Sequence, residues 1–96
     1  METNQLHAIS KALGDPTRFE ILRRIAACEE TACSALNEEF PVTQATISHH
    51  LRELQEAGLI ETRKQAKYIH IKLNRAVWDG YLKALAALLP QNSEGG

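Results

Sequence analysis

The sequence predicts a mainly α-helical domain of five helices that also contains one small β-hairpin. Over most of the chain, apolar residues recur every three or four positions, as they do along one face of a helix. Over residues 67–73 apolar and polar residues alternate instead, which is typical of a strand. The chain has 96 residues, a length that suits one domain. We therefore expect a single domain over 1–96, with a flexible tail over about 90–96.

The first half of the chain predicts three helices joined by short turns. Gly14 is a natural stop for the first helix, and Asp15 and Pro16 suit the N-cap and the first position of the second. Thr31 suits the N-cap of a short third helix. On the second helix the expected apolar face consists of Phe19, Leu22, Ile25 and Ala26. The three helices are expected over about residues 4–13, 16–27 and 32–40.

A fourth helix is expected to begin after a tight turn and to be followed by a hairpin. Thr43 suits its N-cap, and Ala57 ends it before Gly58. The hairpin turn is expected at Gln65-Ala66, which lacks the Gly or Asn that tolerates positive φ, so a longer or less regular turn is indicated. In the second strand, three apolar residues share the inner face: Ile69, Ile71 and Leu73. The two strands are expected over about residues 59–64 and 67–73.

A final helix is expected over about residues 75–89. It carries a row of large apolar side chains, namely Val77, Trp78, Tyr81, Leu82, Leu85, Leu88 and Leu89. A domain of this size buries only a limited core by itself. The row therefore indicates that a second copy of the chain covers this helix.

The order of these elements predicts a winged helix-turn-helix that binds double-stranded DNA. An α-helix fits the major groove, where outward side chains reach the edges of the bases. Gln44 offers a donor and an acceptor that suit adenine, and a methyl group of Ala45 or Thr46 can contact thymine. The expected DNA-contacting residues on the fourth helix are Thr43, Gln44, Ala45, Thr46, Ser48 and His49.

Positive charge is concentrated in the same part of the chain. Residues 1–40 hold four Lys or Arg and seven Asp or Glu, whereas residues 41–75 hold six and three. Contacts with phosphate are expected from the hairpin, or wing, and from the end of the fourth helix, and they make affinity depend on salt. His50 has two open roles, a hydrogen-bonded structural one and a phosphate contact. The expected phosphate-contacting residues are Arg52, Arg63, Lys64, Lys67 and Tyr68.

Three blocks of sequence resemble the ArsR-type (ArsR/SmtB) family of repressors, and the resemblance extends over roughly residues 5–89. The blocks are LGDPTRFEIL from residue 13, TQATISHHLREL from residue 43 and EAGLI from residue 56. The resemblance implies a homodimer joined through the first and last helices. It also implies a repressor that binds an imperfect inverted repeat in a promoter.

The metal sites of this family are not expected here. Metal-sensing members resemble one another in a motif of two Cys and one Asp on the third helix, which is closed by a leucine that aligns with Leu36. At the three ligand positions this chain has Ala32, Ser34 and Ala35, and Cys33 falls on a spacer. Other members use Asp and His on the last helix, where this chain has Asp79 and no histidine. We therefore expect neither a metal nor a cofactor.

The two cysteines, Cys28 and Cys33, leave three interpretations open. They can be small residues that fill the core, they can form a thiol or redox switch, or they can bind a metal or arsenical with a third ligand such as His7. Two cysteines are too few for a disulfide scaffold, so the cytoplasm is the expected location.

Other classes of protein are disfavoured by the sequence. There is no apolar run of membrane length. Residues 1–5 are neither basic nor apolar, so a secretory signal is not expected there. No nucleophile–base pair, phosphate loop or pair of carboxylates stands at catalytic spacing, so an enzyme is not expected. The alternative from another class is a protein–protein interaction module on the same scaffold.

Overall fold

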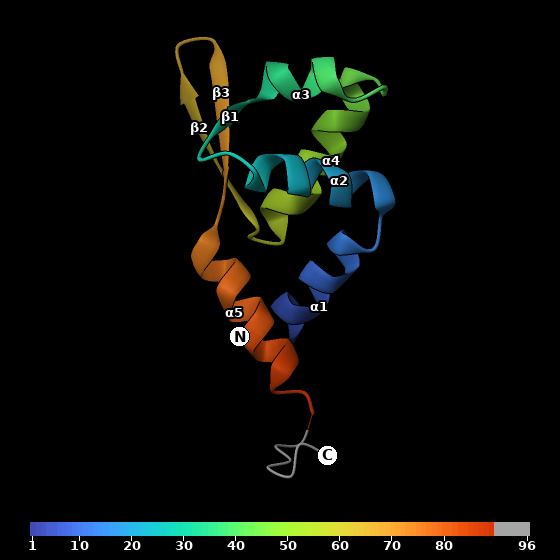
Figure 1. Ribbon diagram of the computed structural model, residues 1–96, viewed down its shortest axis with the longest axis vertical. Helices are drawn as coiled ribbons and strands as arrows, with labels where there is room; N and C mark the ends of the chain where they lie inside the picture. The colour runs from blue at the N-terminus through green and yellow to red at the C-terminus, as the bar shows by residue number, and fades with distance from the viewer. Residues whose placement is uncertain (90–96) are drawn as a thin grey trace.

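A computed structural model describes residues 1–89 of the chain, and the tail expected over 90–96 lies outside the described residues. The described part contains five helices and three strands, and the five helices and the hairpin confirm the fold that the sequence predicts (Figure 1). The elements are α1 (Thr3–Leu13), α2 (Pro16–Ala26), β1 (Thr31–Ala32), α3 (Cys33–Glu39), α4 (Gln44–Glu56), β2 (Ile60–Gln65), β3 (Tyr68–Leu73) and α5 (Arg75–Ala86).

Two helices begin where the sequence predicts, because a side chain satisfies a free backbone N–H at each start. The Asp15 carboxylate accepts a hydrogen bond from the Arg18 amide at 2.9 Å, and Pro16 occupies the first turn of α2. That hydrogen bond holds the pKa of Asp15 below its usual value. At the start of α4, the Thr43 hydroxyl accepts from the Thr46 amide at 3.2 Å.

The predicted role of Thr31 is wrong. Thr31 is buried in β1, which pairs with β3 so that Thr31 lies opposite Ile71. The three strands form one antiparallel sheet in the order β1-β3-β2. Helix α3 instead begins after Ala32, whose side chain has no oxygen with which to cap it. A strand of two residues is too short to show an alternating pattern in the sequence. Residues 31 and 32 are extended because they pair with β3.

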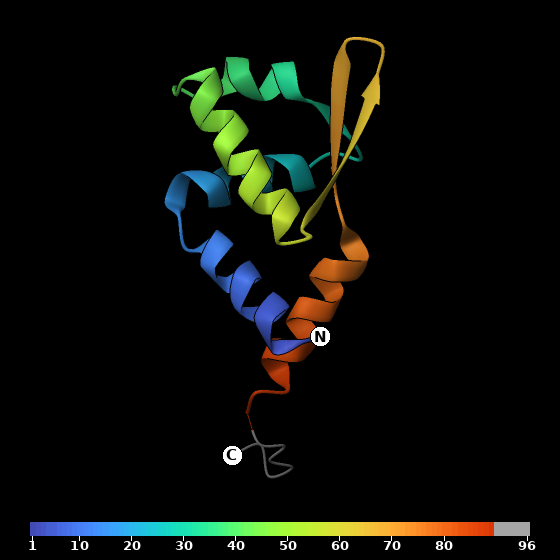
Figure 2. The same cartoon turned by 180° about the vertical axis from the view of Figure 1, so that it is seen from behind.

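The core lies between α2, α3, α4 and the base of the sheet, which together we call the body. Figures 1 and 2 show these helices beside the sheet, with the wing (the β2–β3 hairpin) projecting past them at one end. Each of these elements, or a turn next to it, contributes a side chain to the buried set. The largest fully buried side chains are Ile9, Ile21, Ile25, Leu36, Ile47, Leu54, Leu59 and Ile71.

Two apolar side chains that the sequence places on buried faces are exposed instead. Phe19 is 40% exposed and Ile69 is 44% exposed. Ile69 lies towards the tip of the wing, beyond the reach of the core, whereas Ile71 on the same face is fully buried. Periodicity identifies a face of a strand but does not show how far the core extends along it.

The wing turns one residue later than the sequence predicts. Gln65 pairs with Tyr68, so the turn consists of Ala66 and Lys67. Ala66 has a φ of 56°, in the left-handed region, where an alanine is strained by about 1 kcal/mol. The turn is therefore short although it contains neither Gly nor Asn.

Helices α1 and α5 extend away from the body at the end opposite the wing tip (Figures 1 and 2). The Ser10 and Tyr81 hydroxyl oxygens are 3.0 Å apart and join the two helices. The described residues have a radius of gyration of 15.2 Å, compared with about 12.5 Å for a compact chain of this length. The projecting pair of α1 and α5, which we call the terminal helices, and the wing at the opposite end both lengthen the molecule.

Candidate nucleic-acid interface

The exposed side of α4 presents several polar side chains with no internal partner. Within residues 1–89, the side chains of Gln44, Ser48, His49 and Arg52 make no ion pair and no hydrogen bond. Together with exposed Ala45 they form the reading face. Because their donors and acceptors are free, these side chains can bond to a ligand without breaking a contact inside the protein.

Thr43 and Thr46 differ from the rest of the predicted set. Their hydroxyl oxygens lie 2.9 Å apart, and that of Thr43 also caps the helix. Thr43 is exposed and Thr46 is half-buried. Their hydroxyl groups therefore form hydrogen bonds at the start of α4. These bonds hold the first turn of the helix, from which the reading face begins.

His50 lies on the inner side of α4. It is 6% exposed, and its Nδ1 accepts a hydrogen bond from Nε of Arg18 at 3.2 Å. Burial lowers the pKa of His50 below its usual value, which keeps the ring neutral and able to accept. Of its two open roles, the hydrogen-bonded structural one matches this environment, because the contact ties the start of α2 to the middle of α4.

The wing carries its predicted residues on the surface, but their environments differ. Arg63, Lys64, Lys67 and Tyr68 are all exposed. Nζ of Lys67 lies 5.6 Å from the centroid of the Tyr68 ring, within the range of a cation–π contact. Arg63 instead donates to Glu30 and to Gln65, each at 2.8 Å.

A hollow of about 190 Å³ brings the reading face and the wing together. Gln44 lines it from α4, and Lys67 and Tyr68 line it from the wing. Helix α3 contributes two polar residues that the sequence did not predict at the DNA-binding surface, Ser34 and Asn37. The Asn37 Oδ1 atom is buried without a hydrogen-bond partner among the described residues. No pattern in the sequence distinguishes these two from ordinary surface residues of a short helix.

The two cysteines occupy different environments and form no disulfide with each other. Cys28 is exposed after α2, so its interpretation as a buried core residue is wrong. Its Sγ accepts from the Arg24 guanidinium at 3.2 Å. Cys33 is half-buried at the start of α3, and burial raises the pKa of its thiol.

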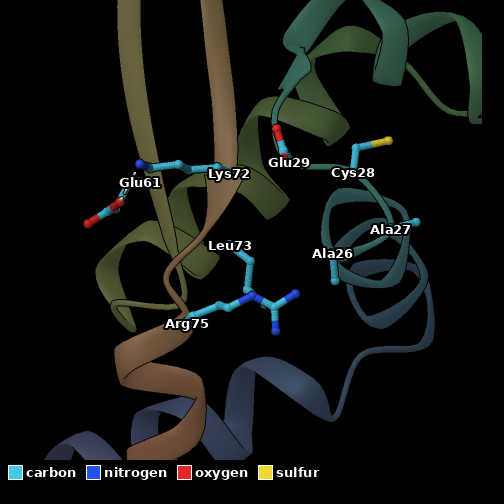
Figure 3. Close-up of a pocket in the computed structure, with 8 residues that line it drawn as sticks. All are labelled: Ala26, Ala27, Cys28, Glu29, Glu61, Lys72, Leu73 and Arg75. Atoms are coloured by element: carbon cyan, nitrogen blue, oxygen red, sulfur yellow. Dashed lines mark ion pairs between the residues drawn. The ribbon is translucent and has the colours of Figure 1, made fainter.

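Cys28 stands at the edge of a larger hollow of about 530 Å³ between the end of α2, β3 and the start of α5. Figure 3 shows the Arg75 side chain extending across this hollow towards Ala26, while the sulfur of Cys28 points away from it. Lys72 at its other edge forms an ion pair with Glu61, with Nζ and Oε2 3.7 Å apart. The thiol therefore faces solvent and not the interior of the hollow.

Two further features can be stated for the described part of the chain. Among residues 1–89, no three side chains of His, Cys, Asp or Glu are grouped so that they could hold a metal ion. No helix in the same range is long and apolar enough to cross a membrane.

Comparisons with known proteins agree with this geometry. A family model described as a helix-turn-helix domain matches residues 13–63. An arsenical resistance operon repressor of Staphylococcus aureus is 35% identical over 92 residues, which cover 96% of this chain and 88% of that protein. The transcriptional repressor SdpR of Bacillus subtilis is 33% identical over 72 residues, 75% of this chain and 79% of its own length.

A solved structure supports the same assignment. The ArsR-like transcriptional regulator from Rhodococcus sp. RHA1 superposes with a TM-score of 0.80 at 29% identity, and the match covers 88% of this chain and 79% of that one. Sequence and fold therefore point to one group of proteins. This chain belongs to the ArsR family of winged helix-turn-helix transcriptional regulators.

Proposed function

We propose that this protein is a homodimeric repressor that binds an inverted-repeat DNA site in a promoter. The observation that carries the proposal is the reading face, where Gln44, Ser48 and His49 are exposed and have no partner within residues 1–89. Short polar side chains of this kind let the backbone of a helix approach the base edges. The relatives in Staphylococcus aureus and Bacillus subtilis carry names that describe them as repressors.

The terminal helices support the dimer. Leu82 is 46% exposed, and Leu85 is half-buried on the same side of α5. Trp78 precedes them at helical spacing on α5, so the three residues form one apolar stripe. A stripe of this kind on a small chain marks a protein–protein interface. Two copies related by a two-fold axis would present two reading faces, which suits an inverted repeat.

The effector is proposed to differ from that of the arsenical-resistance relative. Ala32 in β1 and Ala35 in α3 offer no metal-binding side chain at two of the three family positions. The exposed thiol of Cys28 is the better placed of the two cysteines for oxidation. Two mechanisms therefore stand: a repressor whose occupancy follows its own concentration in the cytoplasm, and one that is released by oxidation of Cys28.

Selection of bound duplexes from a random pool tests the DNA-binding proposal. The expected outcome is enrichment of a two-fold symmetric motif whose half-sites are about one helical turn apart. Enrichment of nothing over the input pool would contradict it and would favour a protein-interaction module. Binding of the selected duplex is then measured with zinc, arsenite or a thiol oxidant. Release by the oxidant alone, lost in Cys28→Ser but kept in Cys33→Ser, identifies the redox mechanism.

A further inference from the structure

The guanidinium of Arg63 donates to two acceptors of the same chain. Its NH2 group donates to Oε1 of Glu30 at 2.8 Å, and its NH1 group donates to Oε1 of Gln65 at 2.8 Å. The Arg63 side chain is about half-exposed, so it is held by these two acceptors and not by burial. Lys64 and Lys67 on the same wing have no ion pair among the described residues. Arg63 therefore differs from Lys64 and Lys67 in being held by a carboxylate of the protein.

The sheet holds Glu30 in position. Glu30 immediately precedes Thr31, which is buried and paired with Ile71 in β3. The cross-strand partner of Arg63 is His70. Nδ1 of His70 lies 3.7 Å from Oε1 of Glu30, the oxygen that also accepts from Arg63. The carboxylate thus lies against the wing on a short, fixed segment. The hydrogen bond from Arg63 also holds the pKa of Glu30 below its usual value, which favours the charged carboxylate.

An ion pair of this kind changes what the wing offers to DNA. Non-specific affinity grows with the number of protein cations that neutralise phosphates. A guanidinium that is shared with a carboxylate contributes little, because a phosphate must first displace that carboxylate. We propose that Glu30 is a specificity-determining residue, which withholds Arg63 from the phosphate backbone and so limits non-specific binding by the wing. The proposal rests on the proposed DNA-binding function.

The direct test is Glu30→Gln, with Glu29→Gln as its matched control. Both changes remove one negative charge at adjacent positions, but Glu29 makes no ion pair within residues 1–89. Binding to a random-sequence duplex is measured by fluorescence anisotropy over a series of salt concentrations. Glu30→Gln is expected to tighten binding about three- to tenfold and to steepen the slope of log K against log salt by about one. Glu29→Gln is expected to change affinity less than about twofold, with no change of slope.

A second pair of proteins assigns the effect to Arg63. When Arg63→Gln is already present, adding Glu30→Gln is expected to change the affinity for DNA no more than Glu29→Gln does in the wild-type protein. Thermal unfolding of each variant confirms that the fold is kept, which the exposure of both side chains favours.

Two outcomes would overturn this role of Glu30 alone: a Glu30→Gln effect equal to that of Glu29→Gln, or a gain that persists without Arg63. Failure of the wild-type protein to bind any duplex at low salt would instead overturn the proposed function, and this inference with it.

Discussion

The body and the terminal helices differ in how completely they bury their apolar side chains. Of the eight largest fully buried side chains, only Ile9 belongs to a terminal helix. Helix α5, all of which is described, buries Tyr81 and leaves Leu82 exposed. The body has a complete core around α4, whereas the terminal helices have apolar surface left over. From this difference we expect that the proposed DNA binding and the proposed pairing with a second copy can be perturbed separately.

The largest effect is expected from a cavity in the body. Leu54→Ala removes a fully buried side chain of α4 and should lower the free energy of unfolding by about 2–5 kcal/mol. Urea unfolding at low protein concentration measures the change. Leu82→Ala, on the terminal helices, is the matched control and should cost less than about 1 kcal/mol there. Equal losses of unfolding free energy for the two variants would contradict the difference in packing between the body and the terminal helices.

The next effect concerns association and not the fold. Leu82→Glu places a charge on the apolar stripe of α5 and should weaken the dimer at least about tenfold, because the charge would lose its water on burial. Sedimentation velocity over a concentration series measures the dissociation constant. Ile69→Glu is the matched control, because Ile69 is exposed to a similar degree, 44% against 46%, but lies on the wing. A Leu82→Glu protein that stays as dimeric as Ile69→Glu would place the interface elsewhere.

A smaller effect is expected where the reading face begins. Thr43→Ala removes the hydroxyl that accepts from the Thr46 amide and should cost about 1 kcal/mol. Thr43→Ser keeps the hydroxyl and should restore most of the loss. Thermal unfolding gives the stability, and hydrogen exchange at Thr46 reports on the first turn of α4. If alanine and serine behave alike, the cap contributes nothing to this helix.

The smallest effect is a dependence of stability on pH. Burial lowers the pKa of His50 in the folded state, so the unfolded chain binds a proton at higher pH than the folded one. The contribution of His50 is therefore intact above about pH 6.5, the usual value, and is lost as the pH falls below it. His50→Gln should flatten the difference in stability between pH 7.5 and pH 5.5. An unchanged pH profile would show that another group causes it.

Signals carried by neighbouring residues could be predicted from the sequence. The caps at Asp15 and Thr43 act over three residues, and the structure confirms both. The amphipathic pattern of α4 likewise places Ile47 and Leu54 in the core. These features depend on contacts within one turn of helix, which a single sequence contains in full.

Features that depend on distant partners could not be predicted. Glu30 and Arg63 are 33 positions apart, and their ion pair exists only because β1 joins the sheet. His50 is 32 positions from the Arg18 side chain that donates to it. Periodicity alone therefore gave Arg63 the same role as Lys64, although their environments differ.

One measurement tests the central claim, that the reading face selects the DNA sequence. The wild-type protein and a Gln44→Ala/His49→Ala variant are titrated by fluorescence anisotropy against the selected duplex and a scrambled one at the same salt concentration. Loss of base contacts should reduce the ratio of specific to non-specific affinity about tenfold or more and leave scrambled-duplex affinity nearly unchanged. An unchanged ratio would contradict the account, because the sequence would then be read by another part of the molecule.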